Sequence, residues 1–241
     1  MNKEMLEQLP VNKAIHPGDK MFGVMKKNNN EKGYYVSGKK NTAVFWSLVK
    51  KFSPSLIEGK KVMDYGCGHG RMTRHMRNFF QPTALVAADV LPDGVDFCAK
   101  EFDTVPFVIS NENPISQMDE TIDIIIAVSV FSHLPRASFE ANMGGLSKVL
   151  SKDGLLMFTA NGEQWRKTHK ITLDSGFYFS NFAARIPKNK FKASDLPLQE
   201  YGQTCVSVNF VKALLQRVDL RLVDHIPQGH VGKQDIYIAC H

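Results

Sequence analysis

The chain has 241 residues, of which 43% are hydrophobic and 22% are charged, and its formal net charge is +6. This length and composition suit one globular domain with a large core and exclude a disordered or fibrous chain. No apolar run reaches about eighteen residues, so no membrane-spanning helix is expected. The polar opening M-N-K-E-M-L-E-Q-L-P is unlike a signal peptide.

The positive charge has two interpretations. It can be a solvated surface that keeps the protein soluble, or it can attract an acidic acceptor such as a phosphorylated or carboxylated molecule. Nucleic acid is not the favoured partner, because no basic motif interleaved with aromatic residues occurs. A basic cluster without an assigned role comprises Arg185, Lys188, Lys190 and Lys192.

The cysteines are scattered, with no C-x-x-C pair and no histidine-rich cluster. This usage favours a reducing, cytoplasmic location and argues against a structural zinc site. The four cysteines are Cys67, Cys98, Cys205 and Cys240.

Residues 1–53 are predicted to form a cap or lid. The first 45 residues are polar and interrupted by proline and glycine, and Asn28-Asn29-Asn30 reads as a loop tip. Apolar residues at helical spacing predict a helix over Ala43–Phe52, which Pro54 ends. This segment is too polar to make a core of its own, so we expect it to pack over the sheet or the mouth of a pocket.

Strands and helices alternate over residues 54–160. Strands are predicted at Lys60–Asp64, Ala84–Ala88, Val105–Ile109, Ile122–Val130 and Leu155–Thr159. Helices are predicted at Gly70–Phe80, from Pro92 onward, and at Pro135–Leu150. This alternation predicts an α/β fold with a doubly wound, mainly parallel sheet.

Residues 161–205 show no clean period and are predicted to be an insertion on the substrate side. A closing helix is expected over Val206–Val218, followed by strands at Leu220–Ile226 and Ile236–Cys240. The whole chain is therefore predicted to be a single domain, 1–241, in which residues 206–241 close the sheet.

The stretch V-M-D-Y-G-C-G-H-G-R runs from an apolar strand through a glycine turn toward a helix, as in nucleotide-type pockets. A dinucleotide loop requires a small residue at the sixth position of G-x-G-x-x-G/A, where this chain has Arg71. Asp64 before the first glycine would also repel phosphate. A dehydrogenase is therefore disfavoured, and the site suits a cofactor that has a cationic group and no phosphate.

The D-x-G-x-G-x-G pattern resembles the first motif of class I S-adenosylmethionine-dependent methyltransferases. That family implies a seven-stranded sheet whose last strand is antiparallel. It also implies that S-adenosylmethionine is the cofactor, with S-adenosylhomocysteine as product, and that Asp64, Gly66 and Gly68 hold its methionine end. Cys67 lies inside the same loop and is expected to be a small packing residue there, not a nucleophile.

Further cofactor contacts are expected at later strand ends. Asp89 closes the second strand about twenty residues after the glycines, where an acid can accept both ribose hydroxyls, and Val90 follows it. In the resembling family an acid or amide after the third strand meets adenine, which here is Asn111 or Glu112. Ser129 would lie beside the methionine part.

The fourth strand ends in S-V-F-S-H-L, which resembles small-molecule methyltransferases of this class. No [DN]-P-P-[YFW] and no metal-binding Asp follows, so base modification and magnesium-dependent catalysis are disfavoured. His133 is the candidate general base, and the alternative is a packing histidine.

Aromatic residues in the cap and the insertion are candidate acceptor contacts. They are Tyr34, Tyr35, Trp165 and His169. For each of them the competing interpretation is loop or lid packing.

The sequence thus predicts metal-independent methyl transfer to a hydroxyl or amine of a small molecule, with a sugar or glycan precursor favoured by resemblance. The alternatives are an RNA or protein methyltransferase and a non-catalytic regulatory protein that binds the cofactor. The pattern leaves the oligomeric state open.

Overall fold

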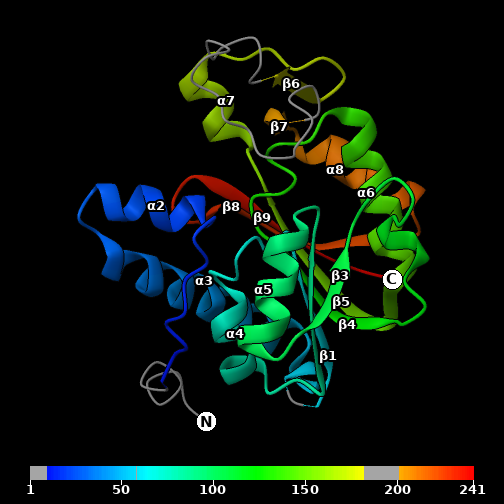
Figure 1. Cartoon of the computed structure of the whole chain (residues 1–241). Helices are drawn as coiled ribbons and strands as arrows, with labels where there is room; N and C mark the ends of the chain where they lie inside the picture. Colours follow the sequence, from blue (N-terminus) through cyan, green and yellow to red (C-terminus); the bar gives the residue numbers. More distant parts are fainter. Residues whose placement is uncertain (1–9, 58, 182–200) are drawn as a thin grey trace. The chain divides into compact units, whose positions relative to one another are not determined.

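The structure is a computed structural model that describes residues 10–57, 59–181 and 201–241 (Figure 1). The helices are α2 (Lys20–Lys27), α3 (Glu31–Phe52), α4 (Thr73–Phe80), α5 (Pro92–Phe102), α6 (Arg136–Val149), α7 (Glu163–His169) and α8 (Val208–Arg217), with short turns η1 (Pro54–Leu56) and η2 (Ile115–Gln117). The strands are β1 (Lys61–Tyr65), β2 (Ala84–Asp89), β3 (Val105–Val108), β4 (Ile122–Ala127), β5 (Leu150–Ala160), β6 (Phe177–Asn181), β7 (Gly202–Val206), β8 (Arg221–His230) and β9 (Gln234–Cys240).

Seven strands follow the order β3-β2-β1-β4-β5-β9-β8. β1 pairs in parallel with β2 and β4, and β2 pairs in parallel with β3. β9, the last strand in the chain, runs antiparallel to both β5 and β8. The predicted α/β fold, with a mainly parallel seven-stranded sheet and an antiparallel last strand, is therefore confirmed.

The chain divides into two compact units. The first unit extends to Asn113 and includes Ile122–Ile126, and the second comprises Pro114–Thr121 and Ala127–His241. The prediction of a single domain stays a prediction.

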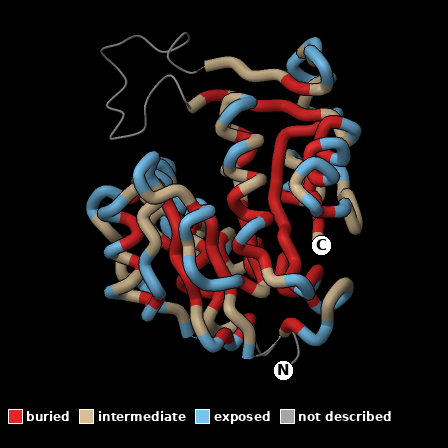
Figure 2. The backbone as a smooth tube through the Cα atoms, turned by 90° about the vertical axis from the view of Figure 1, so that its right-hand side faces the viewer, coloured by how far each residue is buried: buried red, intermediate tan, exposed pale blue. Residues whose placement is uncertain are grey.

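In the first unit, the parallel strands carry apolar side chains on both faces, as expected for a sheet covered on both sides. β1 and β2 are buried along nearly their whole length, and Figure 2 shows long buried stretches of the backbone in red. α5 packs on β2 and β3, while α4 packs against α3. Pro92 is the first residue of α5, where its missing N–H costs no hydrogen bond.

In the second unit, α6 and α8 bury the apolar faces that their spacing predicted. Phe139, Met143 and Leu146 are buried on α6, and Phe210 and Leu214 on α8. β6 and β7 form a separate antiparallel pair, with α7 packed beside β7.

The helix predicted over Ala43–Phe52 begins earlier, at Glu31, and α2 was not predicted, whereas the loop tip predicted at Asn28-Asn29-Asn30 separates the two helices as expected. Asp19 caps α2 by accepting from the Phe22 amide, and Asn30 caps α3 by accepting from the Gly33 amide. Gly38 lies inside α3, where a side chain would meet the backbone carbonyl of Arg71. The glycine that suggested a loop thus permits a close helix contact.

Several predicted boundaries also shift. α4 begins at Thr73 because the three preceding residues form a turn, and β4 ends at Ala127 because Ser129 adopts a left-handed backbone with φ of 60°. β5 begins at Leu150, so the predicted turn at Asp153-Gly154 lies within a strand. β8 continues to His230 through an irregularity in its pairing with β9.

The predicted insertion over residues 161–205 contains α7, β6 and β7 among its described residues. The basic cluster at Arg185, Lys188, Lys190 and Lys192 lies outside the residues that the structure describes. Within the described ranges, no helix combines the length and hydropathy needed to cross a bilayer.

The contact at Gly38 gives a stability prediction. A Cβ added at this position would lie 2.1 Å from the carbonyl oxygen of Arg71, so Gly38→Ala must push α3 away from the glycine turn. We expect a loss of about 1–3 kcal/mol in unfolding free energy, measured by urea denaturation.

Gly23→Ala is the matched control, because Gly23 lies within α2 and nothing lies within 4 Å of its added Cβ. Helix propensity then predicts a gain of about 0.5–1 kcal/mol. Equal effects of the two substitutions would contradict the close contact.

Candidate cofactor site

The glycine turn connects β1 to α4 in a left-handed backbone. Gly66, Gly68 and Gly70 have φ angles of 83°, 52° and 77°. The amides of Gly66 and Cys67 both donate to the carbonyl of Ala88, at 2.7 and 3.2 Å, so the turn is fastened to the end of β2. A Cβ on Gly70 would lie 2.3 Å from the Phe102 ring, which excludes any larger residue there.

Asp89 completes the turn from the neighbouring strand. One carboxylate oxygen, Oδ2, accepts from the Gly68 amide at 2.7 Å, and Oδ1 accepts from the Leu91 amide at 3.0 Å. The residue is only 8% exposed, and this burial raises its pKa. Each oxygen keeps a second lone pair, so a carboxylate already fixed in position can accept further hydrogen bonds.

Asp64 lies under the turn at the end of β1 and is 3% exposed. The Thr73 hydroxyl donates to its Oδ2 at 2.6 Å. Burial, with a smaller contribution from the nearby charge of Asp89, raises the pKa of Asp64 to about 6. A cation placed beside Asp64 would stabilise the ionised carboxylate that burial disfavours, so the site favours a positively charged ligand.

The remaining predicted cofactor residues of this unit are exposed. Val90 directly follows Asp89 and is accessible to solvent. Asn111 and Glu112 occupy the tip of a turn in which the Asn113 amide donates to the hydroxyl of Ser110. The turn that carries Asn111 and Glu112 follows β3, which pairs with β2. The Ile109 amide, just after β3, donates to the carbonyl of Asp89 at 2.8 Å.

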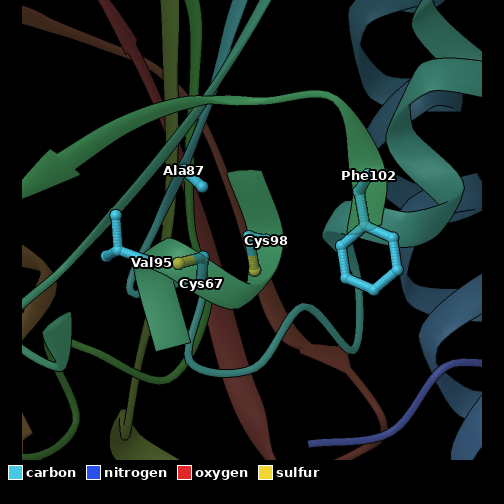
Figure 3. Close-up of a cluster of buried hydrophobic side chains, with 5 residues drawn as sticks. All are labelled: Cys67, Ala87, Val95, Cys98 and Phe102. Carbon is cyan, nitrogen blue, oxygen red and sulfur yellow. The ribbon is translucent and has the colours of Figure 1, made fainter. Parts of the chain in front are cut away.

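Cys67 contributes to packing under the turn. Figure 3 shows it in a buried cluster with Ala87, Val95, Cys98 and Phe102. Contact with the Cys98 thiol and burial raise the pKa of Cys67 well above its ordinary value. A thiol held in this protonated form is a poor nucleophile.

Tyr34 and Tyr35 belong to α3. Tyr34 is fully buried, and its hydroxyl donates to Asp19 at 2.5 Å, so its ring offers no surface to a ligand in this conformation. Tyr35 is half-buried and donates to the carbonyl of Lys13 at 3.0 Å. Both tyrosines fasten the segment before α2.

Arg74 is a residue whose importance the sequence did not reveal. It is buried at the start of α4, where its guanidinium lies over the rings of Tyr34 and Phe102. Its Nη1 donates to the carbonyls of Asn12 and Ala14, at 3.0 and 2.9 Å. An arginine in a helix normally reads as a surface charge, so spacing gives no signal for this role.

In the second unit, Ser129 lies in a polar network. Its amide donates to the Thr159 hydroxyl at 2.8 Å, and its hydroxyl donates to Oε1 of Gln234 at 3.0 Å. Gln234 also accepts from Thr159 and donates to the Ser132 hydroxyl. Gln234 was not predicted, because it joins Ser129 across 105 positions of the sequence.

His133 follows this network. Its Nδ1 lies 2.8 Å from the carbonyl of Gly202, and its ring stacks on Tyr201 at 4.6 Å. A carbonyl can only accept, so Nδ1 carries the proton and Nε2 carries the lone pair. Burial lowers the pKa of His133 below its ordinary value, which keeps the ring neutral at neutral pH.

Trp165 and His169 form a stacked pair on α7, with ring centroids 4.1 Å apart. Nδ1 of His169 also lies 2.9 Å from the Trp165 carbonyl. The structure thus brings the predicted residues together in two sets. Asp64, the glycine turn and Asp89 belong to the first unit, and Ser129, His133 and the α7 pair belong to the second.

Comparison with solved structures gives the same fold. An S-adenosylmethionine-dependent methyltransferase from Clostridium acetobutylicum matches with a TM-score of 0.57 at 12% identity, over 91% of this chain and 96% of that one.

Two curated mycobacterial proteins are similar in sequence. Fatty-acid O-methyltransferase of Mycolicibacterium smegmatis is 22% identical over 68% of this chain and 53% of its own length. Cyclopropane mycolic acid synthase 1 of Mycobacterium tuberculosis is 25% identical over 64% of this chain and 55% of its own length. The chain therefore spans about half the length of these relatives.

The family model described as "Methyltransferase domain" matches residues 39–222, which include the glycine turn, Asp89 and His133. This match covers more than half of the chain, and the chain belongs to the methyltransferase domain family.

Proposed function

We propose that this protein transfers a methyl group from S-adenosylmethionine to an oxygen or nitrogen of a small molecule. The observation that carries the proposal is the buried Asp89 carboxylate bonded to the Gly68 amide, because it puts a fixed anionic acceptor beside a glycine turn that has no phosphate fingerprint. Membership of the methyltransferase domain family supports it.

In this proposal the first unit binds the cofactor. The two ribose hydroxyls donate to the free lone pairs of Asp89, and the turn at Gly66–Gly68 faces the methionine end. The ammonium group is attracted by Asp64, whose buried carboxyl accepts a hydrogen bond from the Thr73 hydroxyl. Asn111 or Glu112 meets the adenine, and Val90 lies beside it.

Ser129 is proposed as a contact of the methionine part of the cofactor, and His133 as the residue that acts on the acceptor. The backbone around Ser129 is held by Gln234 and Thr159, and His133 has the tautomer of a general base. As a hydroxyl or amine attacks the methyl group, Nε2 of His133 takes the proton that it releases. The sulfonium is itself a strong electrophile, so positioning supplies much of the rate.

Two observations bear on the acceptor class, and they favour different molecules. Trp165 and His169 form a stacked aromatic surface that suits the apolar face of a sugar, and a sugar or glycan precursor was favoured by the sequence. The names of the mycobacterial relatives instead concern fatty and mycolic acids. An acidic acceptor is compatible with both, and the protein is proposed to act in the cytoplasm.

The experiment that tests the activity is methyl transfer from labelled S-adenosylmethionine into fractionated cell extract. Label in the sugar or lipid fraction supports the proposal and separates the two acceptor classes. Label in RNA or protein would favour a macromolecular substrate instead. Cofactor binding without transfer to any fraction would favour a non-catalytic regulatory role.

Asp89→Asn tests the ribose contact. The amide oxygen can still accept from the Gly68 and Leu91 amides, but the charge is lost. We expect affinity for S-adenosylhomocysteine to fall by about 1–3 kcal/mol, roughly 5- to 150-fold, in calorimetry. The affinity of the Asp89→Ala variant for S-adenosylhomocysteine should fall at least as far.

Asp96→Asn is the control for Asp89, because it removes the same charge from an exposed position on α5. Its affinity should match the wild type. Unchanged affinity of Asp89→Asn would remove Asp89 from the site.

The raised pKa of Asp64, about 6, predicts pH-dependent binding. The ammonium of S-adenosylhomocysteine stays charged below pH 7 and favours the ionised carboxyl. Affinity should therefore be constant above about pH 7 and fall as the pH drops below about 6, by a slope approaching tenfold per unit. Calorimetry across this range measures the slope.

Asp64→Asn is the control for this pH dependence. In the unliganded wild type the raised pKa has the opposite effect on folding, because the stability that Asp64 contributes is lost as pH rises from about 4 through 6. The Asp64→Asn variant should bind S-adenosylhomocysteine more weakly at pH 7. Both its binding and its stability should lose the pH dependence that Asp64 causes. If its binding kept the wild-type slope, the ammonium would not lie beside Asp64.

His133→Gln separates catalysis from packing. The glutamine amide can donate to the Gly202 carbonyl as Nδ1 does, but it cannot take a proton. We expect kcat to fall by about 10²–10⁴-fold, with S-adenosylhomocysteine affinity nearly unchanged. His133→Ala should show the same loss.

The pH profile of the wild type provides a second readout. Since burial lowers the pKa of His133, kcat should be independent of pH above about 6.5 and decline in more acidic buffer. A fully active His133→Gln variant would reduce His133 to a packing role.

A further inference from the structure

A group of two histidines and one carboxylate lies beside the glycine turn, outside the residues assigned to the cofactor. Oδ2 of Asp93 is 3.1 Å from Nε2 of His69 and 3.7 Å from Nδ1 of His16. All three atoms lie within 4.8 Å of one another, and this is the one such group among the described residues. We propose that His16, His69 and Asp93 form a binding site for a divalent transition-metal ion such as Zn²⁺.

The distances between the three ligand atoms suit coordination of one shared ion. Ligands that are each about 2.1 Å from one ion lie roughly 3 to 4.2 Å apart. Both distances from Asp93 already fall in this range. The two histidine nitrogens lie within 4.8 Å of each other and need to approach by less than about 1 Å. The rings now stack with centroids 4.6 Å apart and planes 12° apart, so at least one ring must turn to aim its lone pair at the shared ion.

The site is braced before any ion binds. Arg74 donates to the carbonyls of Asn12 and Ala14 and also to the carbonyl of His69, so one buried side chain fastens both segments that carry the histidines. Asp93 lies in the first turn of α5. Ligands on three preordered elements lose little freedom when they bind.

The ligand chemistry selects the ion. Two imidazoles and one carboxylate suit Zn²⁺ and its neighbours in the transition series, whereas Mg²⁺ and Ca²⁺ prefer an all-oxygen shell. The His69 side chain is 8% exposed but that of Asp93 is 51% exposed, so the ion can enter from solvent and keep water ligands.

Binding exchanges two existing hydrogen bonds. The Gly18 amide donates to Nδ1 of His16 at 3.1 Å, which shows that this nitrogen carries a lone pair for an ion to take. In the contact between His69 and Asp93 the neutral ring donates from Nε2; when the ion takes this nitrogen, the ring carries its single proton on Nδ1 instead. The ion would tie the segment before α2 to the glycine turn.

The sequence argued against a structural zinc site because it has no C-x-x-C pair and no histidine-rich cluster, and the three residues proposed here are spread over positions 16 to 93. The ion takes no part in methyl transfer, and its binding does not depend on which acceptor the protein methylates. It concerns only the attachment of the opening segment to the turn.

The test is titration of the untagged full chain, stripped with a chelator, with Co²⁺ and then Zn²⁺. We expect one Co²⁺ per chain, seen as a visible d–d absorption band that Zn²⁺ abolishes. His16→Ala and Asp93→Asn should each weaken binding by more than about tenfold, since each removes one ligand. Circular dichroism checks that both variants fold.

His169→Ala is the matched control, because it removes an exposed histidine from α7 in the other unit. It should bind Co²⁺ as the wild type does. Absence of binding to the wild type would overturn the proposal. Equal binding by the wild type and both folded variants would also overturn it, because the ion would then lie elsewhere.

Discussion

The hydrogen bond from the Gly68 amide to the Asp89 carboxylate is the interaction on which the candidate site depends. It joins a left-handed glycine turn after β1 to the end of β2, and the Gly66 and Cys67 amides reinforce it by donating to Ala88. A buried carboxylate costs free energy unless backbone amides satisfy it. The turn therefore holds the charge in place before a ligand arrives, and a ligand has only to add its own hydrogen bonds.

Much of this part of the fold was predictable from the sequence because it is local. The apolar runs at β1, β2 and β4 and the proline at the start of α5 specify their elements through neighbouring residues alone. The glycine spacing and the acid about twenty residues later mark the turn for the same reason. Asp64 was predicted to favour a cation, and its burial supplies the physical cause.

The features that the sequence did not reveal depend on contacts between distant residues. Gly38 reads as a loop residue until the carbonyl of Arg71 is seen against it, and Arg74 reads as a surface charge until its carbonyl partners are known. Gln234 reaches the Ser129 network from the far end of the chain. Such residues carry no periodic signal, because their partners are set by the packing of whole elements.

The most direct test of this account is a crystal structure of the full chain with S-adenosylhomocysteine bound. The account predicts both ribose hydroxyls on the carboxylate of Asp89, and the methionine end along Gly66–Gly68 with its ammonium near Asp64. A ligand bound at another site, or a ribose that makes no contact with Asp89, would contradict it.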